Sequence, residues 1–282
     1  RQHPGNIIHR IGENGFHVYE LPCSPNDTVF PSGLSHADWL GVTQERDAEL
    51  CIPIISQIKP DWLIVDHYAI DHVWHEKLRA FVNRIMVIDD LADRRHDCDL
   101  LLDQNYGRQT LDYVPYVTKK TTLLVGAHYV ILRPEFTQWR NFSLKRRLNS
   151  KVEQVLITMG GIDAGNVTGR VLTEMKKCRL PDDILIKVVM GDTSPWLEQV
   201  RLLSESMPFY TEVMVGINNM AEVMANSDLA IGAAGSTSWE RCSLGLPTIT
   251  VVLAENQRNA AKLLKEIKAV EVLDNNNMIA LS

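Results

Sequence analysis

The sequence predicts an α/β protein built from two Rossmann-like domains. Helical patterns alternate with short β-branched runs along the 282 residues, which is typical of parallel sheets covered by helices. This rhythm pauses over the polar, basic segment 136–151 and then restarts. We therefore place one domain at residues 1–140 and the other at residues 141–282, with segment 136–151 as the junction.

The sequence of the first half predicts helices at residues 37–58 and 71–82. The helix at residues 71–82 has an apolar side made by Val73, Leu78, Phe81 and Val82. A nucleotide-type α/β domain normally opens with a strand and a glycine-rich turn, but this chain starts with a predicted helix at residues 6–15. We expect the first domain to lack its opening strand, and the chain to be shortened at both ends. The apolar runs predict strands at residues 16–21, 61–66, 84–89, 99–104 and 121–126.

The second half contains two turns suited to an anion. A helix that begins at Ser236 or Thr237, directly after a strand and Gly235, directs free N–H groups and its positive end beyond the sheet. We expect a phosphate there. The predicted strands are residues 152–161, 184–191, 209–216, 229–235 and 248–253, of which the first four end in glycine.

The other turn covers residues 160–166. Gly160 and Gly161 let backbone amides approach a ligand, while Asp163 or Asn166 can cap the next helix. The spacing matches neither a dinucleotide fingerprint nor a Walker A loop, so alone it indicates only a capped turn. Paired with the turn at Gly235, it predicts a nucleotide cleft at the carboxyl ends of neighbouring strands.

The composition of the chain excludes some classes of binding partner. The net charge of −6 argues against nucleic acid and anionic membranes, and no apolar run or leader indicates a membrane span or secretion. We expect a cytoplasmic protein, and the sequence leaves its oligomeric state open. Five scattered cysteines without a C-x-x-C pair predict buried thiols in a reducing compartment; they are Cys23, Cys51, Cys98, Cys178 and Cys242.

Two polar clusters could bind metal. One loop carries Asp89, Asp90, Asp93, His96, Asp97 and Asp99. Arg94 and Arg95 offset its charge, so we favour a hydrogen-bonded loop. The histidines His67, His72 and His75 lack an acidic third ligand. We predict no metal ion and no cofactor.

Four motifs carry a family resemblance: GAAGSTSWERCSLGLPTITVVLAENQ, ITMGGIDAGN, VDHYAIDHVW and IDDLADRRHDCDLLLDQN. In this order, and over nearly the whole chain, they resemble the UDP-2,4-diacetamido-2,4,6-trideoxy-beta-L-altropyranose hydrolases of pseudaminic acid biosynthesis, relatives of MurG-type glycosyltransferases. The resemblance implies a two-domain GT-B architecture. It also implies metal-independent, inverting hydrolysis of a UDP-sugar, with UDP on the second domain and the sugar facing the first.

The resemblance implies roles for individual residues. Gly235, Ser236 and Thr237 would hold the phosphates. Gly160, Gly161, Asp163 and Asn166 belong to the nucleotide cleft predicted above. Spacing alone leaves Glu240 as either a helix-capping charge or an acceptor for both ribose hydroxyls, and the resemblance implies the second role. Uracil would lie against backbone from Val215 to Asn218, including Ile217. Tyr68 and Asn256 would line the sugar and the reaction centre, and Gln257 would contact the UDP-sugar.

Without the resemblance, Tyr68 is a strand-end residue with its hydroxyl in solvent and Asn256 is a helix cap. Members also carry an opening Gly-x-Gly-His-x-x-Arg turn whose histidine is expected to activate water, and this sequence has no such motif. His17 does not replace it, because it lies in the predicted strand 16–21 and lacks the arginine. A glycosyltransferase that needs an acceptor and a UDP-sugar-binding fragment without turnover therefore remain as alternatives.

Overall fold

The computed structural model describes residues 6–22, 33–34, 36–148 and 151–274. Contacts divide the chain into two units, residues 1–129 and residues 130–282, and we describe each unit by itself. Each contains one sheet in which every strand pair is parallel. The predicted pair of α/β units is thus confirmed.

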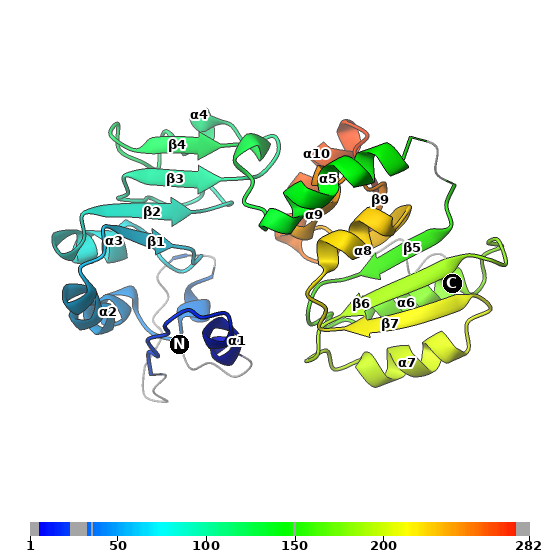
Figure 1. Cartoon of the computed structure of the whole chain (residues 1–282). Coiled ribbons are helices and arrows are strands. Elements are labelled where there is room, and N and C mark those ends of the chain that lie inside the picture. The colour runs from blue at the N-terminus through cyan, green and yellow to red at the C-terminus, as the bar shows by residue number, and fades with distance from the viewer. Residues whose placement is uncertain (1–5, 23–32, 35, 149–150, 275–282) are drawn as a thin grey trace. The chain divides into compact units, whose positions relative to one another are not determined.

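The first unit contains a sheet in the order β1-β2-β3-β4 (Figure 1). One face, with Val65, Ile85 and Leu101, is packed in a buried cluster with residues of α2 and α3. The elements are α1 (Ile8–Glu13), η1 (Ala37–Leu40), α2 (Gln44–Ile58), β1 (Trp62–Val65), α3 (His72–Leu78), η2 (Arg79–Phe81), β2 (Arg84–Ile88), β3 (Leu100–Asp103), α4 (Thr110–Tyr113), β4 (Thr122–Val125) and η3 (Ala127–Tyr129).

Two predictions for the first unit need correction. The strand predicted at residues 16–21 is absent from the described sheet, and Phe16 and Tyr19 are exposed. An alternating pattern specifies a strand only where a neighbour pairs with it. The helix predicted at residues 37–58 is interrupted, because Gly41 adopts a left-handed conformation (φ 73°) and Thr43 caps α2 by accepting a hydrogen bond from the Arg46 N–H.

The second unit has six strands in the order β10-β9-β8-β5-β6-β7. The elements are α5 (Pro134–Arg146), β5 (Gln154–Thr158), α6 (Val167–Met175), β6 (Leu185–Met190), α7 (Leu197–Glu205), β7 (Tyr210–Val215), α8 (Met220–Asn226), β8 (Leu229–Ala233), α9 (Thr237–Ser243), β9 (Thr248–Val252), η4 (Glu255–Gln257), α10 (Arg258–Glu266) and β10 (Glu271–Asp274). The strand β10 was not predicted, because its run Glu-Val-Leu-Asp offers only two apolar residues.

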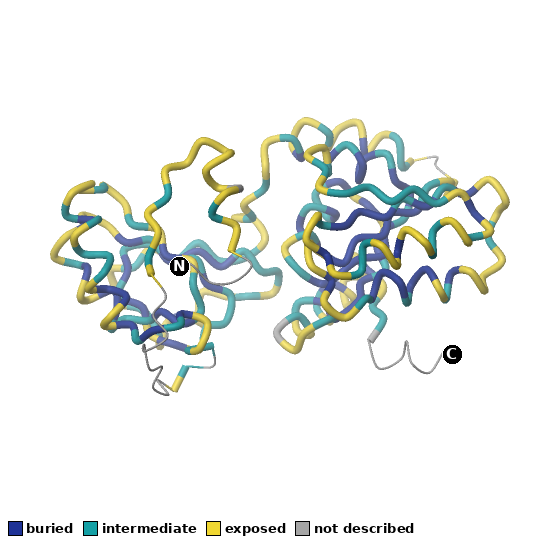
Figure 2. Tube along the Cα trace, turned by 90° about the horizontal axis from the view of Figure 1, so that it is seen from below, coloured by how far each residue is buried: buried dark blue, intermediate teal, exposed yellow. Residues whose placement is uncertain are grey.

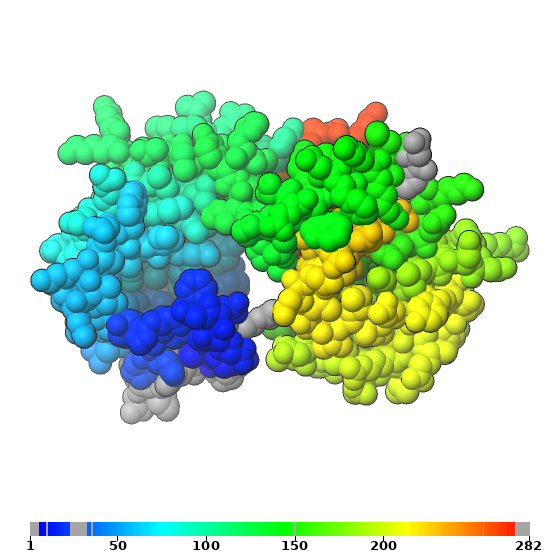
Figure 3. Space-filling view, in the orientation of Figure 1, coloured from blue at the N-terminus to red at the C-terminus, as the bar shows by residue number. Residues whose placement is uncertain are grey.

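Alternation along the strands of the second unit builds a core on each side of the sheet. Val155 and Ile157 pack with residues of α6 and α7, whereas Leu156 between them packs with residues of α5 and α8. Figure 2 shows the result: the strands are mostly buried, and the helices alternate between buried and exposed residues. In the space-filling view, α5 and α8 lie side by side on one face of this unit (Figure 3).

The segment predicted as the junction belongs mainly to helix α5, inside the second unit. Several of its polar residues donate to carbonyl groups of that unit: Ser143 donates to Leu244 O (2.7 Å) and Arg147 donates to Met224 O (2.9 Å). Polar side chains that suggested a linker in the sequence therefore hold α5 against the rest of the second unit.

The four described cysteines are free thiols, as predicted, and Cys23 lies outside the described residues. The prediction that they are buried holds only for Cys98, because Cys51 and Cys242 are half-buried and Cys178 is exposed. Among the described residues, the helices lack the combination of length and apolar character that a membrane span requires.

Candidate functional site

The order of the strands in the second unit locates the candidate site. Numbered from β5, the order is 3-2-1-4-5-6 read from β7, so the direction of connection reverses between β5 and β8. In open α/β sheets, ligands bind outside the carboxyl ends of the strands at this reversal. The two turns singled out in the sequence, after β5 and after β8, are the turns that flank it.

The turn after β8 presents unpaired amides. In the described part of the chain, the N–H groups of Gly235, Ser236 and Thr237 have no acceptor, and Ser236 is exposed. Ser236 makes no capping bond to α9. A Cβ atom added at Gly235 would meet nothing within 4 Å, so the space over this backbone is open within the unit. The turn is suited to binding an anion through its backbone.

In the turn after β5, some backbone N–H groups donate to side chains of the protein and others face solvent. The carboxylate of Asp163 accepts from the N–H groups of Val167 (2.8 Å) and Thr168 (2.9 Å), and Asn166 accepts from Gly169 (3.2 Å). The start of α6 is thus already capped, as the sequence predicted. Gly160 and Gly161 are exposed and their N–H groups have no acceptor among the described residues, so only this part of the turn is available to a ligand.

The next loop braces this turn. Ser194 donates to Ile162 O and Trp196 donates to Ala164 O, both at 3.0 Å. Gly191, at the end of β6, lies so close that an added Cβ would clash with the carbonyl group of Gly161. The backbone at residues 160–164 is therefore held by contacts that involve no ligand.

Glu240 lies in α9, one turn after the open amides. Its carboxylate is 3.6 Å from Arg133, which also pairs with Glu135 at 3.0 Å. Burial raises the pKa of Glu240, and the Arg133 charge opposes that rise. Its side chain retains 18% exposure, so a ligand hydroxyl can still reach the carboxylate.

Arg241, the next residue, was not predicted as a functional residue. It is 1% exposed, and its guanidinium donates to Ala233 O (2.7 Å), Ser238 Oγ (3.1 Å) and Thr237 Oγ1 (3.3 Å). Its Nε atom has no hydrogen-bond partner among the described residues. Sequence gives no sign of this burial, because it depends on Gly232 in the neighbouring strand, where a Cβ would clash with the guanidinium.

The remaining residues assigned to the second unit lie at the same edge of the sheet. Val215 ends β7, and Ile217 packs its side chain against the cluster around Phe136. Gln257 in η4 accepts from the Leu253 N–H (3.0 Å), so its amide oxygen fixes the loop after β9. Asn256 also belongs to η4, and its side chain lies outside the described part of the structure.

Tyr68 follows β1 at the carboxyl edge of the first sheet. Its hydroxyl donates to Asp90 Oδ2 (2.9 Å) rather than lying free in solvent. Burial raises the pKa of Tyr68, as does the Asp90 charge, so the residue remains a phenol at neutral pH. The rings of His36 and Trp39 lie against it at 5.2 and 5.6 Å, and Trp39 is 56% exposed.

The acidic loop is held by hydrogen bonds and ion pairs, as favoured above. Asp89 pairs with Arg94 at 2.7 Å and accepts from the Tyr113 hydroxyl at 2.8 Å. Arg79 joins Asp97 at 3.0 Å and Asp99 at 2.6 Å. Over the described residues, no group of three or more His, Cys, Asp or Glu side chains is arranged to hold a metal ion.

The candidate histidines have different surroundings. His67 accepts from the Ala69 N–H (3.1 Å), whereas His75 is fully buried with its ring 5.6 Å from that of His96. His17 is exposed and contacts Tyr19, outside any described strand.

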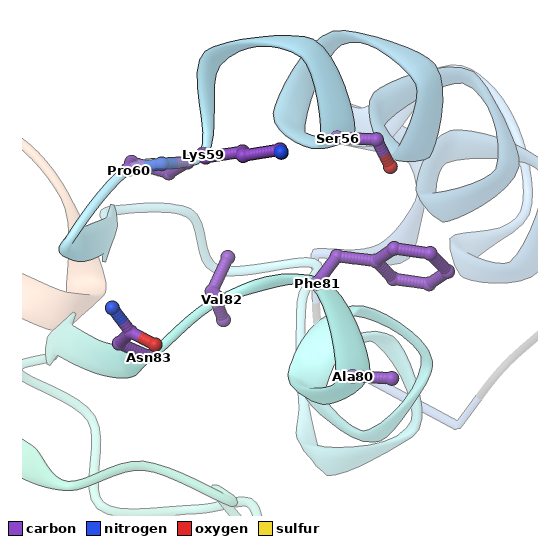
Figure 4. A pocket seen from close by; sticks show the side chains of 7 residues that line it. All are labelled: Ser56, Lys59, Pro60, Ala80, Phe81, Val82 and Asn83. Atoms are coloured by element: carbon purple, nitrogen blue, oxygen red, sulfur yellow. The ribbon is translucent and has the colours of Figure 1, made fainter.

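A hollow of about 440 Å³ occurs elsewhere in the first unit (Figure 4). Its residues precede β1 and β2, so it lies at the amino-terminal edge of the sheet, opposite Tyr68. It shares no residue with the candidate site. The lining residues are Ser56, Lys59, Pro60, Ala80, Phe81, Val82 and Asn83.

Comparison with known proteins assigns the two units to the GT-B fold. Residues 154–280 match the glycosyltransferase family 28 C-terminal domain. The structure is similar to the crystal structure of MurG from Acinetobacter baumannii, with a TM-score of 0.62 and 16% identity, covering 99% of this chain and 78% of that chain. The predicted fold class, two Rossmann-like domains of the GT-B type, is confirmed.

Three curated relatives are similar in sequence. An uncharacterized protein of Methanocaldococcus jannaschii is 27% identical over 90% of this chain and 48% of its own length. The spore coat polysaccharide biosynthesis protein SpsG of Bacillus subtilis is 31% identical over 52% of this chain and 42% of its own length. The UDP-2,4-diacetamido-2,4,6-trideoxy-beta-L-altropyranose hydrolase of Campylobacter jejuni is 27% identical over 78% of this chain and 76% of its own length. The chain thus spans about half the length of the first two.

Proposed function

We propose that this protein binds a UDP-sugar and hydrolyses it to UDP and the free sugar. The observation that carries the proposal is the pair of turns with unpaired amides, at Gly160–Gly161 and at Gly235–Thr237, on either side of the strand reversal. Such amides suit a diphosphate. The similarity to a relative named as a UDP-sugar hydrolase supports the choice of nucleotide and reaction.

In this proposal, the second unit binds the nucleotide. The turn at Gly235, Ser236 and Thr237 holds the phosphates and Glu240 accepts the ribose hydroxyls, while Asp163 and Asn166 act indirectly by fixing the turn after β5. Uracil lies against the backbone from Val215 to Asn218, with Ile217. Asn256 and Gln257 complete the phosphate and sugar side.

Tyr68 serves the sugar side. Because its proton is donated to Asp90, its oxygen offers lone pairs to a ligand hydroxyl or to the attacking water. Water adds its oxygen to the anomeric carbon and gives its proton to the surrounding water, and the bond between that carbon and the diphosphate oxygen breaks. UDP leaves with the bonding electrons, and the turn amides stabilise its added negative charge.

We further propose a UDP-linked 2,4-diacetamido-2,4,6-trideoxy sugar as substrate, in pseudaminic acid biosynthesis, and a reaction that needs no metal ion. The test is UDP release from that substrate in water without an acceptor, with and without a chelator. Release that depends on an added acceptor would identify a glycosyltransferase instead. UDP binding without any release would identify a binding protein without turnover, and absence of UDP binding would contradict the site itself.

A further inference from the structure

The guanidinium of Arg241 is buried without an ion pair among the described residues, although the charge of Glu240 attracts it from a greater distance. At 1% exposure it belongs to the largest fully buried side chains, yet no carboxylate of the described residues lies within 4.0 Å of it. Its three hydrogen-bond partners are neutral oxygens, and its Nε has none. Fully buried arginines are rare unless an anion pairs with them.

The position of this cation coincides with the strand reversal. Gly232 leaves room for it, and a Cβ at residue 232 would also lie 3.0 Å from Thr158 O, at the end of β5. The guanidinium bonds Ala233 on one side of the turn and Thr237 on the other. It therefore joins the two ends of the turn that carries Gly235 and Ser236, whose N–H groups have no acceptor in the described part of the chain.

Burial lowers the pKa of Arg241 to about 10, which leaves the side chain charged at neutral pH. An unpaired buried charge reduces stability substantially unless an opposite charge lies nearby. Glu240 is its neighbour in sequence, but that carboxylate is within 4.0 Å of Arg133 and not of Arg241. The charge of Glu240 opposes the lowering of the Arg241 pKa without forming an ion pair, so an anion on the open side of the turn would add to this attraction.

We propose that Arg241 is a positioning residue that supplies positive charge to the diphosphate site from below, through Thr237 and the turn backbone, without touching the ligand. The inference rests on the proposed UDP site and adds a statement about selectivity. Arg241 favours ligands that carry phosphate over the same nucleoside without phosphate. The electrostatic attraction is strong because the guanidinium is buried, out of contact with water and salt ions.

The test compares UDP with uridine. Titrations of the full chain, by calorimetry for UDP and by NMR for uridine, give the ratio of the two affinities for wild type, Arg241→Gln, Arg241→Lys and the exposed control Arg201→Gln. We expect Arg241→Gln to lower the preference for UDP about 10- to 100-fold with little change in uridine affinity, as expected for a lost charged interaction. Arg241→Lys keeps the charge and should keep the preference within about threefold.

Different failures have different meanings. If wild type does not bind UDP, the proposed function fails. If wild type binds UDP but Arg241→Gln weakens UDP and uridine by the same factor, Arg241 only supports the fold and this inference is overturned. If Arg241→Gln does not fold, the folded Arg241→Lys variant decides: a preserved preference supports the role of the charge, and a lost preference overturns it.

Discussion

Gly235 is the residue at which the phosphate proposal is most directly testable. Its φ is not in the left-handed region and an added Cβ would meet no atom within 4 Å, so Gly235→Ala should fold normally. The new methyl group would stand where a phosphate oxygen approaches the backbone. We expect UDP affinity to fall at least about tenfold, the equivalent of one lost hydrogen bond to a charged group.

Calorimetry measures this affinity, and thermal unfolding checks the fold. Gly12→Ala is the matched control, because Gly12 also has open space around it but lies in α1 of the first unit. Equal UDP affinities of wild type and Gly235→Ala would contradict a backbone site at this turn.

Tyr68→Phe tests the sugar side. The substitution removes the hydroxyl that donates to Asp90 and leaves the ring in place. We expect kcat for UDP release to fall about 10- to 100-fold through loss of positioning, with unchanged UDP affinity because the nucleotide residues belong to the second unit. Steady-state kinetics and UDP titration measure the two effects. Tyr210→Phe, at an exposed tyrosine of the second unit, is the control, and full activity of Tyr68→Phe would remove the residue from the mechanism.

The residues of the site differ in how far the sequence reveals them. A glycine after a strand indicates a tight turn, and an Asp or Asn before a helix indicates a helix cap. The two turns and the capping by Asp163 and Asn166 could therefore be predicted from the sequence. Arg241 reads as a surface residue of a short helix. Its burial follows from the absence of a side chain at Gly232, which is a contact between separate elements that no local pattern encodes.

At the scale of elements, α5 depends on a buried carboxylate. Asp228 binds Arg146 of this helix and accepts from the N–H groups of Glu153 (3.0 Å) and Gln154 (2.8 Å) at the start of β5. Burial alone would raise the pKa of Asp228, but Arg146 and these N–H groups lower it below the ordinary value. The charged form is therefore the stabilising one.

We expect Asp228→Asn to lower the free energy of unfolding by about 1–3 kcal/mol, because a charged acceptor of several hydrogen bonds becomes a neutral one. Urea denaturation at neutral pH measures the change. The exposed Asp183→Asn in the same unit is the control. A variant as stable as wild type would show that α5 is held by its apolar contacts instead.

The sequence predicts the helices and strands that have buried apolar runs. It does not predict those that depend on a neighbouring strand or on acceptors in distant loops. The strands β5, β6 and β8 carry apolar residues on both faces, because helices cover both sides of the sheet. The run Phe16–Leu21 has similar residue types but no strand beside it in the described structure. Segment 136–151 appeared to be a linker because its arginines find their acceptors in distant loops.

At the scale of the whole molecule, the two units have separate hydrophobic cores, and the core of the first includes an acid-sensitive pair. His75 and His96 are 0% and 2% exposed, and their ring nitrogens have no hydrogen-bond partner. Burial lowers the pKa of His75 to about 3 and that of His96 to about 4. Below an ordinary value of about 6.5 the unfolded chain takes up protons that the folded chain does not.

The free energy of unfolding of the first unit should therefore fall as pH drops from about 6.5 toward 4, by about 1.4 kcal/mol per pH unit for each histidine. Urea denaturation at pH 7.5, 6.5 and 5.5 measures this slope. His75→Phe should reduce it by about half, and His9→Gln, at an exposed histidine of α1, should not. A wild-type slope of zero over this interval would contradict the burial of uncharged imidazoles.

Gly191 shows how a position that meets no ligand can determine whether a ligand fits. Even one methyl group there would clash with the carbonyl of Gly161 and displace the turn that we propose faces the nucleotide. Natural variation at residue 191 should accordingly be restricted for reasons of shape alone. A survey that scores only side chains in contact with the nucleotide would miss it.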